Sequence, residues 1–158
     1  MESLEEQLVR YQSMPPSRRD FVGTYEGILQ DRNRLSIPKE FRDIIDLIQP
    51  SSGIVAFTLA SYGFIPVIQF MPEIVYNQRA AKVSAVDDLK LKADFAGSYY
   101  IRKWDGQGRL LIPQRFLNLT HIQEGNDIYI IGCNETFIAR AVQVDHVEPE
   151  EFVRDVKE

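Results

Sequence analysis

Two arginines, each at the start of a short apolar segment, are the side chains best suited to specific chemistry in this chain. Arg34 begins the segment RLSIPKEF, and Arg109 begins the similar segment RLLIPQRF. The segments lie 75 residues apart and agree at five of their eight positions. A guanidinium group can donate two parallel hydrogen bonds to O6 and N7 of guanine. Both arginines are therefore candidates for contacting DNA bases.

Further basic residues surround each segment and would suit contacts with DNA phosphates. They are Arg32, Lys39 and Arg42 near the first segment, and Arg102, Lys103 and Arg115 near the second. Phosphate contacts position a protein on DNA without specifying a sequence. Binding through them weakens steeply with salt because bound counterions are released. Any one of these side chains, taken alone, is more often a solvated surface charge.

The turn before Arg109 offers a carboxylate at a useful spacing. In Asp105-Gly106-Gln107-Gly108 we expect both glycines to supply positive φ and Asp105 to bond the backbone two residues on. One interpretation is that Asp105 and Arg109 form an ion pair that stabilises the turn while their charges are solvated. The other is that Asp105 positions Arg109 for DNA contact. Both can hold together.

The repeated segments belong to larger repeated units. Expected strands over residues 25–29 and 98–104 lead into the two segments, and Pro38 and Pro113 stand where short helices begin. Two further apolar stretches follow in each half and predict a β-hairpin. Because units this small cannot bury enough surface alone, we expect them to interleave their strands into one barrel. The predicted fold class is mainly β with short helices, α+β.

This interpretation divides the chain into five parts. They are a helical arm (1–20), a first repeat (21–70), a helical connector (71–95), a second repeat (96–142) and an acidic tail (143–158). Ser3 and Glu6 predict the start of a helix in the arm. Ser84 to Asp87 predict a capping box for the second connector helix.

Composition narrows the classes of function. The net charge is −5, and the tail holds six acidic against two basic residues. A lone Cys133 and two histidines give little material for a disulfide or a zinc site. The first residues, Met1 to Glu6, are acidic and lack an apolar core, so we do not expect a secretory signal there. No apolar run approaches the roughly 20 residues of a membrane span. We expect a cytoplasmic protein with no membrane partner, metal, cofactor, small-molecule substrate or enzymatic activity.

Three motifs, taken in order and with their spacing, resemble the MraZ family. They are Gly23 to Glu26, Arg34 to Pro38, and Asp105 to Pro113, and the resemblance covers roughly residues 21–140. It implies two AbrB-like swapped-hairpin units that share a double-psi-type β-barrel. It also implies a bacterial, nucleoid-associated regulator of a division and cell-wall gene cluster. Such a protein would assemble as a homo-oligomeric ring and bind double-stranded DNA at tandem promoter boxes.

The first repeat departs from this family's pattern, in which each repeat has an Asp, three residues and then an Arg. Gln30 occupies the Asp position, Asp31 follows one residue late as a candidate turn residue, and Asn33 replaces a glycine. Asn tolerates the left-handed conformation better than most residues. The altered loop, the acidic tail and the net charge support an alternative: an oligomeric assembly module on the same scaffold that does not bind DNA.

Overall fold

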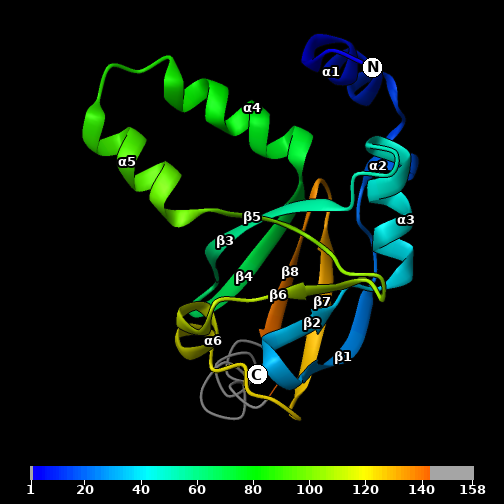
Figure 1. The fold of residues 1–158 in the computed structure, drawn as a ribbon, viewed down its shortest axis with the longest axis vertical. Coiled ribbons are helices and arrows are strands. Elements are labelled where there is room, and N and C mark those ends of the chain that lie inside the picture. The colour runs from blue at the N-terminus through cyan, green and yellow to red at the C-terminus, as the bar shows by residue number, and fades with distance from the viewer. Residues whose placement is uncertain (1, 143–158) are drawn as a thin grey trace, which may run out of the picture.

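A single eight-stranded antiparallel sheet forms the body of the protein. The computed structural model describes residues 2–142. The sheet contains β1 (Thr24–Gln30), β2 (Arg34–Ser36), β3 (Ile54–Tyr62), β4 (Ile65–Pro72), β5 (Tyr100–Lys103), β6 (Arg109–Leu111), β7 (Asp127–Cys133) and β8 (Thr136–Ala141). Its order is β5-β3-β4-β8-β7-β1-β2-β6, and it curls into a nearly closed barrel (Figure 1).

Strands of the two repeats are interleaved in this sheet, mostly as alternating pairs, as the sequence predicts. In the order of the sheet, β4 of the first repeat pairs with β8 of the second, β7 pairs with β1, and β2 pairs with β6. Each repeat therefore completes its hydrogen bonding through the other. The mainly β, α+β fold of interleaved units is confirmed.

Short helices and one 3₁₀ turn connect the strands. They are α1 (Leu4–Ser13), α2 (Pro16–Arg19), η1 (Asp31–Asn33), α3 (Lys39–Ile48), α4 (Glu73–Ser84), α5 (Leu89–Ser98) and α6 (Gln114–Thr120). Pro38 and Pro113 are the N-caps of α3 and α6, so both repeated segments start a helix where the sequence predicts one. The hairpin of α4 and α5 projects from the barrel (Figure 1).

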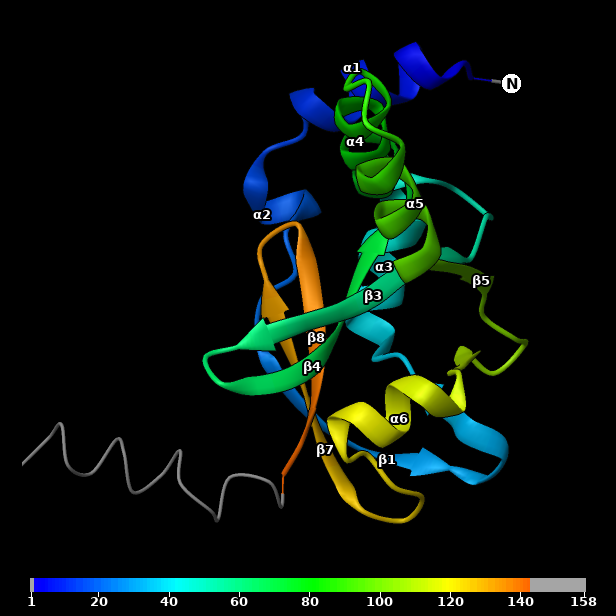
Figure 2. The ribbon, with the colours of Figure 1, turned by 90° about the vertical axis from the view of Figure 1, so that its left-hand side faces the viewer.

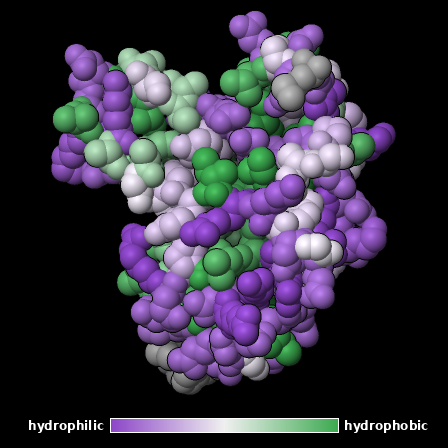
Figure 3. Space-filling view, in the orientation of Figure 1, coloured by the Kyte–Doolittle hydropathy of each residue, from purple (hydrophilic) through white to green (hydrophobic). Residues whose placement is uncertain are grey.

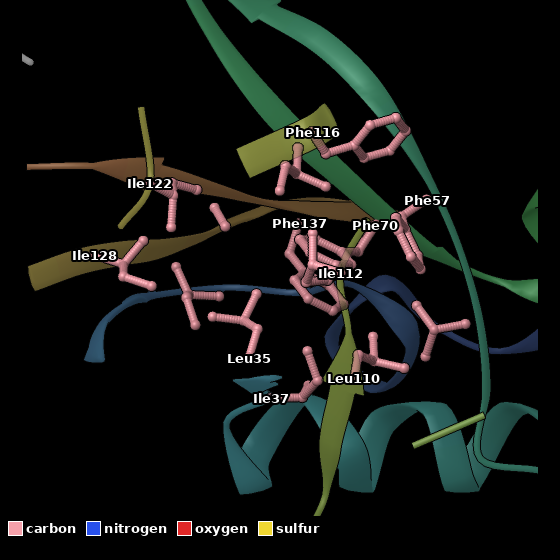
Figure 4. Close-up of a cluster of buried hydrophobic side chains, with 14 of the residues drawn as sticks. Leu35, Ile37, Phe57, Phe70, Leu110, Ile112, Phe116, Ile122, Ile128 and Phe137 are labelled. Carbon is pink, nitrogen blue, oxygen red and sulfur yellow. The ribbon is translucent and has the colours of Figure 1, made fainter. Parts of the chain in front are cut away.

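The main core fills the barrel with equivalent side chains from both repeats. Leu35 and Leu110 are 2% and 0% exposed, and Phe41 and Phe116 are both fully buried. Figure 4 shows several of these side chains converging between the strands. Burying a side chain of this size stabilises the fold by about 1.5–3 kcal/mol. The repeated apolar positions are therefore the positions that bind the two units together.

The N-terminal helix packs on the rest of the molecule through a buried tyrosine. Ser3 and Glu6 form the predicted capping box of α1. Tyr11, which is 4% exposed, joins a second apolar cluster with residues of α3 and α4. Arg10 donates to the backbone carbonyls of Leu47 and Ile48 at the end of α3. A cation there satisfies carbonyls that the helix itself leaves unbonded.

The predicted capping box of the second connector helix is wrong. Helix α4 continues through Ser84, and the side chain of Asp88 caps α5 by accepting from the Leu91 backbone N–H at 3.1 Å. Asp is as good an N-cap as Ser, and Asp88 directly precedes the helix.

The expected boundaries at 70/71 and 95/96 lie within β4 and α5. Across residues 2–142, no helix is long and apolar enough to span a membrane.

Candidate nucleic-acid interface

Strands β2 and β6 form a short two-stranded ribbon that relates the two repeats by a local two-fold axis. Three residues pair across it: Arg34 with Leu111, Leu35 with Leu110, and Ser36 with Arg109. Since equivalent positions lie 75 residues apart, the Leu35–Leu110 pair maps onto itself and the axis passes through it. Both repeats therefore contribute equally to one ribbon at the front of the barrel (Figure 1).

Both arginines lie on the outer face of this ribbon. Side chains alternate between the faces of a strand, and Leu35 and Leu110 point into the core. The alternate positions, Arg34 and Arg109, keep side chains that are 32% and 23% exposed. Hydrophilic residues predominate over β1, β2 and β6 in the space-filling view (Figure 3). The major groove of B-DNA admits a two-stranded β-ribbon, and here the β2–β6 pair continues onto β1 through the Leu29–Leu35 and Gln30–Arg34 pairs.

The second-repeat loop holds Arg109 through the carboxylate of Asp105. Its Oδ1 accepts from the backbone N–H groups of Gln107, at 2.8 Å, and Arg109, at 3.0 Å, and its Oδ2 accepts from Arg109 Nε at 2.9 Å. The Arg109 backbone N–H is the largest cause that lowers the pKa of Asp105 below its ordinary value. The predicted bond two residues on is thus present. The expected ion pair between Asp105 and Arg109 is present as well.

Of the two glycines in this loop, one has the predicted positive φ. Gly108 has a φ of +76° and is buried, whereas Gly106 does not have a positive φ and is exposed. The expectation for Gly106 is wrong because the Asp105 side chain already closes the turn by bonding to Gln107. A single left-handed residue then suffices to lead the chain into β6.

Each arginine also contacts the loop of the other repeat. Arg34 Nη1 lies 3.4 Å from Asp105 Oδ2. Arg109 Nη1 lies 3.0 Å from Gln30 Oε1. The two contacts are related by the local two-fold axis because Gln30 and Asp105 are equivalent positions. We call Gln30, Arg34, Asp105 and Arg109 the arginine cluster; it contains two guanidinium groups and one carboxylate.

The first-repeat loop matches the second at one left-handed position but differs at the residue before it, since Arg32 also has a positive φ and Gln107 does not. Asn33 has a φ of +59°, at the position where the second repeat has Gly108. The Ile112 N–H donates to the Asn33 carbonyl at 2.9 Å, just as the Ile37 N–H donates to that of Gly108 at 3.0 Å. The Asp31 side chain is exposed and forms no hydrogen bond or ion pair within residues 2–142. The late carboxylate therefore does not replace the missing one.

The short helix of each repeat supports the loop of the other. Arg42 of α3 donates from Nε to the Ile37 carbonyl at 3.0 Å, and its guanidinium lies against Gly108. A Cβ at Gly108 would come within 2.6 Å of that guanidinium. On the other side, Gln114 of α6 accepts from the Asn33 side chain at 3.1 Å. Arg42 thus has a structural role in the loop that positions Arg109.

The remaining basic candidates lie around the ribbon on four different elements. Arg32 is exposed on η1 and has a φ of +61°. Lys39, on α3, pairs with Asp43 at 3.0 Å. Arg115 is exposed on α6, where its guanidinium lies 5.3 Å from the Phe116 ring centroid. Arg102 on β5 lies 5.5 Å from the Tyr100 ring centroid, and its neighbour Lys103 is exposed.

Sequence reasoning missed two residues that share the outer face with the arginines. Ser36 and Leu111 alternate with the buried leucines, and Leu111 keeps 43% of its surface exposed. The period-two alternation that starts at Arg34 and Arg109 would have found both. Gln30 departs from the family's pattern of an Asp four residues before the Arg, and the structure places it in contact with Arg109.

Comparison with known protein sequences identifies the family to which the chain belongs. The transcriptional regulator MraZ of Roseiflexus castenholzii is 30% identical over 122 residues, 74% of this chain and 78% of that protein. MraZ of Ureaplasma urealyticum is 27% identical over 129 residues, and MraZ of Bacteroides fragilis is 28% identical over 142, covering 84% of this chain and 85% of the relative. No protein-family profile matches the chain. The chain belongs to the MraZ family.

Proposed function

We propose that this protein regulates transcription by placing the β2–β6 ribbon in the major groove of double-stranded DNA. The observation that carries the proposal is the arginine cluster, which sets Arg34 and Arg109 on one outward face and ties each to the opposite repeat. Guanidinium groups fixed in this way lose little freedom when they contact a base. The relatives are named transcriptional regulators, which agrees with this role.

Within this proposal the basic residues divide into two sets. Arg34 and Arg109 contact bases. The surrounding residues, which contact phosphates and set the register on the duplex, are Arg32, Lys39, Arg42, Arg102, Lys103 and Arg115. Such contacts supply affinity that falls with rising salt. Asp105, Asp31, Gly106 and Gly108 belong to the loops that position the ribbon.

Assembly into a homo-oligomer is part of the same proposal. One ribbon offers few base contacts, so a ring of identical ribbons on tandem promoter boxes would gain affinity through multivalency. An exposed aromatic surface supports a contact between copies: Phe64, in the turn between β3 and β4, is 92% exposed and Tyr62 is 45% exposed. This turn projects from the side of the barrel (Figure 2). The target genes, by resemblance, would serve division and cell-wall synthesis.

The alternative is an assembly module that does not bind DNA. Its structural support is the first-repeat loop, where no carboxylate of that repeat contacts Arg34 among the described residues. Its support from the sequence is the tail of residues 143–158, which lies outside the described residues and holds most of the net negative charge.

A gel-shift experiment separates the two functions. The purified protein is mixed with the upstream region of its own gene, and with an unrelated duplex of equal length, at two salt concentrations. Arg109→Ala is run beside Arg18→Ala, which removes an exposed arginine on α2. We expect selective, salt-sensitive binding that Arg109→Ala loses and Arg18→Ala keeps. Absence of binding at low salt, by folded and oligomeric protein, would favour the assembly module.

A further inference from the structure

Gln30 lies on the same face as the arginines and faces them from a third strand. It is the last residue of β1 and stands opposite Arg34 in the antiparallel pair, while Arg34 stands opposite Leu111. Residues directly opposite in such a pair project on the same side of the sheet. Gln30, Arg34 and Leu111 therefore form a row across β1, β2 and β6 on the outer face of the ribbon.

The amide of Gln30 has one end engaged and one end available. Its Oε1 accepts from Arg109 Nη1 at 3.0 Å. Its Nε2, which carries two N–H donors, has no hydrogen-bond partner within residues 2–142, and the residue is exposed. Arg109 Nη2 likewise has no hydrogen-bond partner within residues 2–142, because the partners of that guanidinium contact Nε and Nη1. Two neighbouring side chains on the outer face thus retain unused donors.

The replacement of a carboxylate by an amide also changes the charge of the cluster. An Asp at position 30 would give the two guanidinium groups two carboxylates, whereas the present cluster has one, Asp105. The arginine cluster therefore carries two positive charges and one negative charge. A carboxylate there would accept hydrogen bonds only and would repel phosphate, while an amide donates and is neutral.

We propose that Gln30 is a specificity-determining residue of this face. Nε2 of Gln30 and Nη2 of Arg109 donate together to a base that presents two adjacent acceptors in the major groove, as guanine does with O6 and N7. Adenine is disfavoured because its N6 donor would meet a second donor. This inference rests on the proposed DNA-binding function and assigns one base contact within it.

The test compares base preference in three single variants. A preferred duplex is first selected from a randomised pool with the wild-type protein. Every position of that duplex is then substituted in turn, and affinities are measured by fluorescence anisotropy for wild type, Gln30→Ala, Gln30→Glu and Gln12→Ala. Gln12 is an exposed glutamine on α1, at the far end of the molecule (Figure 1), and serves as the matched control. Thermal melting confirms that each variant is folded.

We expect Gln30→Ala to lose discrimination at one guanine position by roughly tenfold or more, with unchanged affinity for an unrelated duplex. Gln30→Glu should lose the same preference and also bind both duplexes more weakly, because it adds a negative charge. Gln12→Ala should keep the wild-type profile. A folded Gln30→Ala variant with the wild-type preference at every position would overturn this inference and leave the proposed function standing. A wild-type protein without any sequence preference would overturn both.

Discussion

Arg34 of the first repeat is paired with Asp105 of the second, with Nη1 and Oδ2 separated by 3.4 Å. The same Oδ2 lies 2.9 Å from Nε of Arg109. One acidic residue thus orients the arginines of both repeats, and it is held in turn by two backbone N–H groups of its own loop. The two halves of the ribbon are related by the local two-fold axis. Among the described residues, however, the carboxylate that contacts both arginines comes from the second repeat, and the first repeat has Gln30 at the equivalent position.

Asp105→Asn should weaken sequence discrimination more than it weakens folding. The amide oxygen can still accept from the backbone N–H groups of Gln107 and Arg109, so the turn persists. The charge that attracts both guanidinium groups is lost, so their orientation is less fixed. Affinity for a preferred duplex should fall toward that for an unrelated one, as measured by anisotropy titration. Unaltered discrimination by this variant would show that Asp105 serves the turn alone.

The stabilising effect of Asp105 should depend on pH at the acid end. Hydrogen bonds from the Arg109 and Gln107 backbone N–H groups and from the Arg109 side chain lower the pKa of this carboxyl in the folded state. Its contribution is therefore fully present above the unfolded value, about 3.9, and is lost as the pH falls through the lower folded value. It should not vary between pH 5 and 8.

Denaturant unfolding of wild type and Asp105→Asn between pH 2 and pH 7 measures this effect. The difference in unfolding free energy should be constant near neutral pH and shrink below about pH 4. The Asn side chain does not titrate, so it is the proper reference. A difference that stays constant down to pH 2 would contradict the assigned role of the Asp105 charge.

The two glycines of the second loop should differ sharply in their tolerance of alanine. Gly108→Ala places a Cβ at a φ of +76° and within 2.6 Å of the Arg42 guanidinium. Strain of that kind costs about 1–3 kcal/mol. Gly106→Ala is the matched control, because Gly106 has no positive φ and no atom within 4 Å of an added Cβ. Urea unfolding should show destabilisation for Gly108→Ala alone; equal losses at both positions would refute this account of the loop.

The repeat in the sequence predicted most of the fold for a physical reason. Positions such as Phe41 and Phe116 are fully buried in equivalent environments, so selection for the same packing left the same residue types 75 residues apart. Helix starts at Pro38 and Pro113 followed from the missing N–H of proline. These are local or repeated signals that a single sequence contains.

Contacts between the repeats could not be predicted in the same way. The sequence shows Asp105 four residues before Arg109, but the pairing of Arg34 with Asp105 depends on how β2 meets β6. The contact between Gln30 and Arg109 depends on the same register. The cap of α5 was missed for a smaller reason, since Ser84 and Asp88 have similar capping propensities and the choice depends on where α4 ends.

Arg115→Ala should change how DNA binding depends on salt while leaving base preference intact. Its exposed guanidinium on α6 has a ring contact with Phe116 and no ion pair within the described chain, so it is free to meet a phosphate. Loss of one such contact should reduce the slope of log affinity against log salt by about one. Anisotropy titrations across several salt concentrations give that slope, and Arg18→Ala on α2 should leave it unchanged. If Arg115→Ala instead altered preference at one base position, its assignment as a phosphate contact would be wrong.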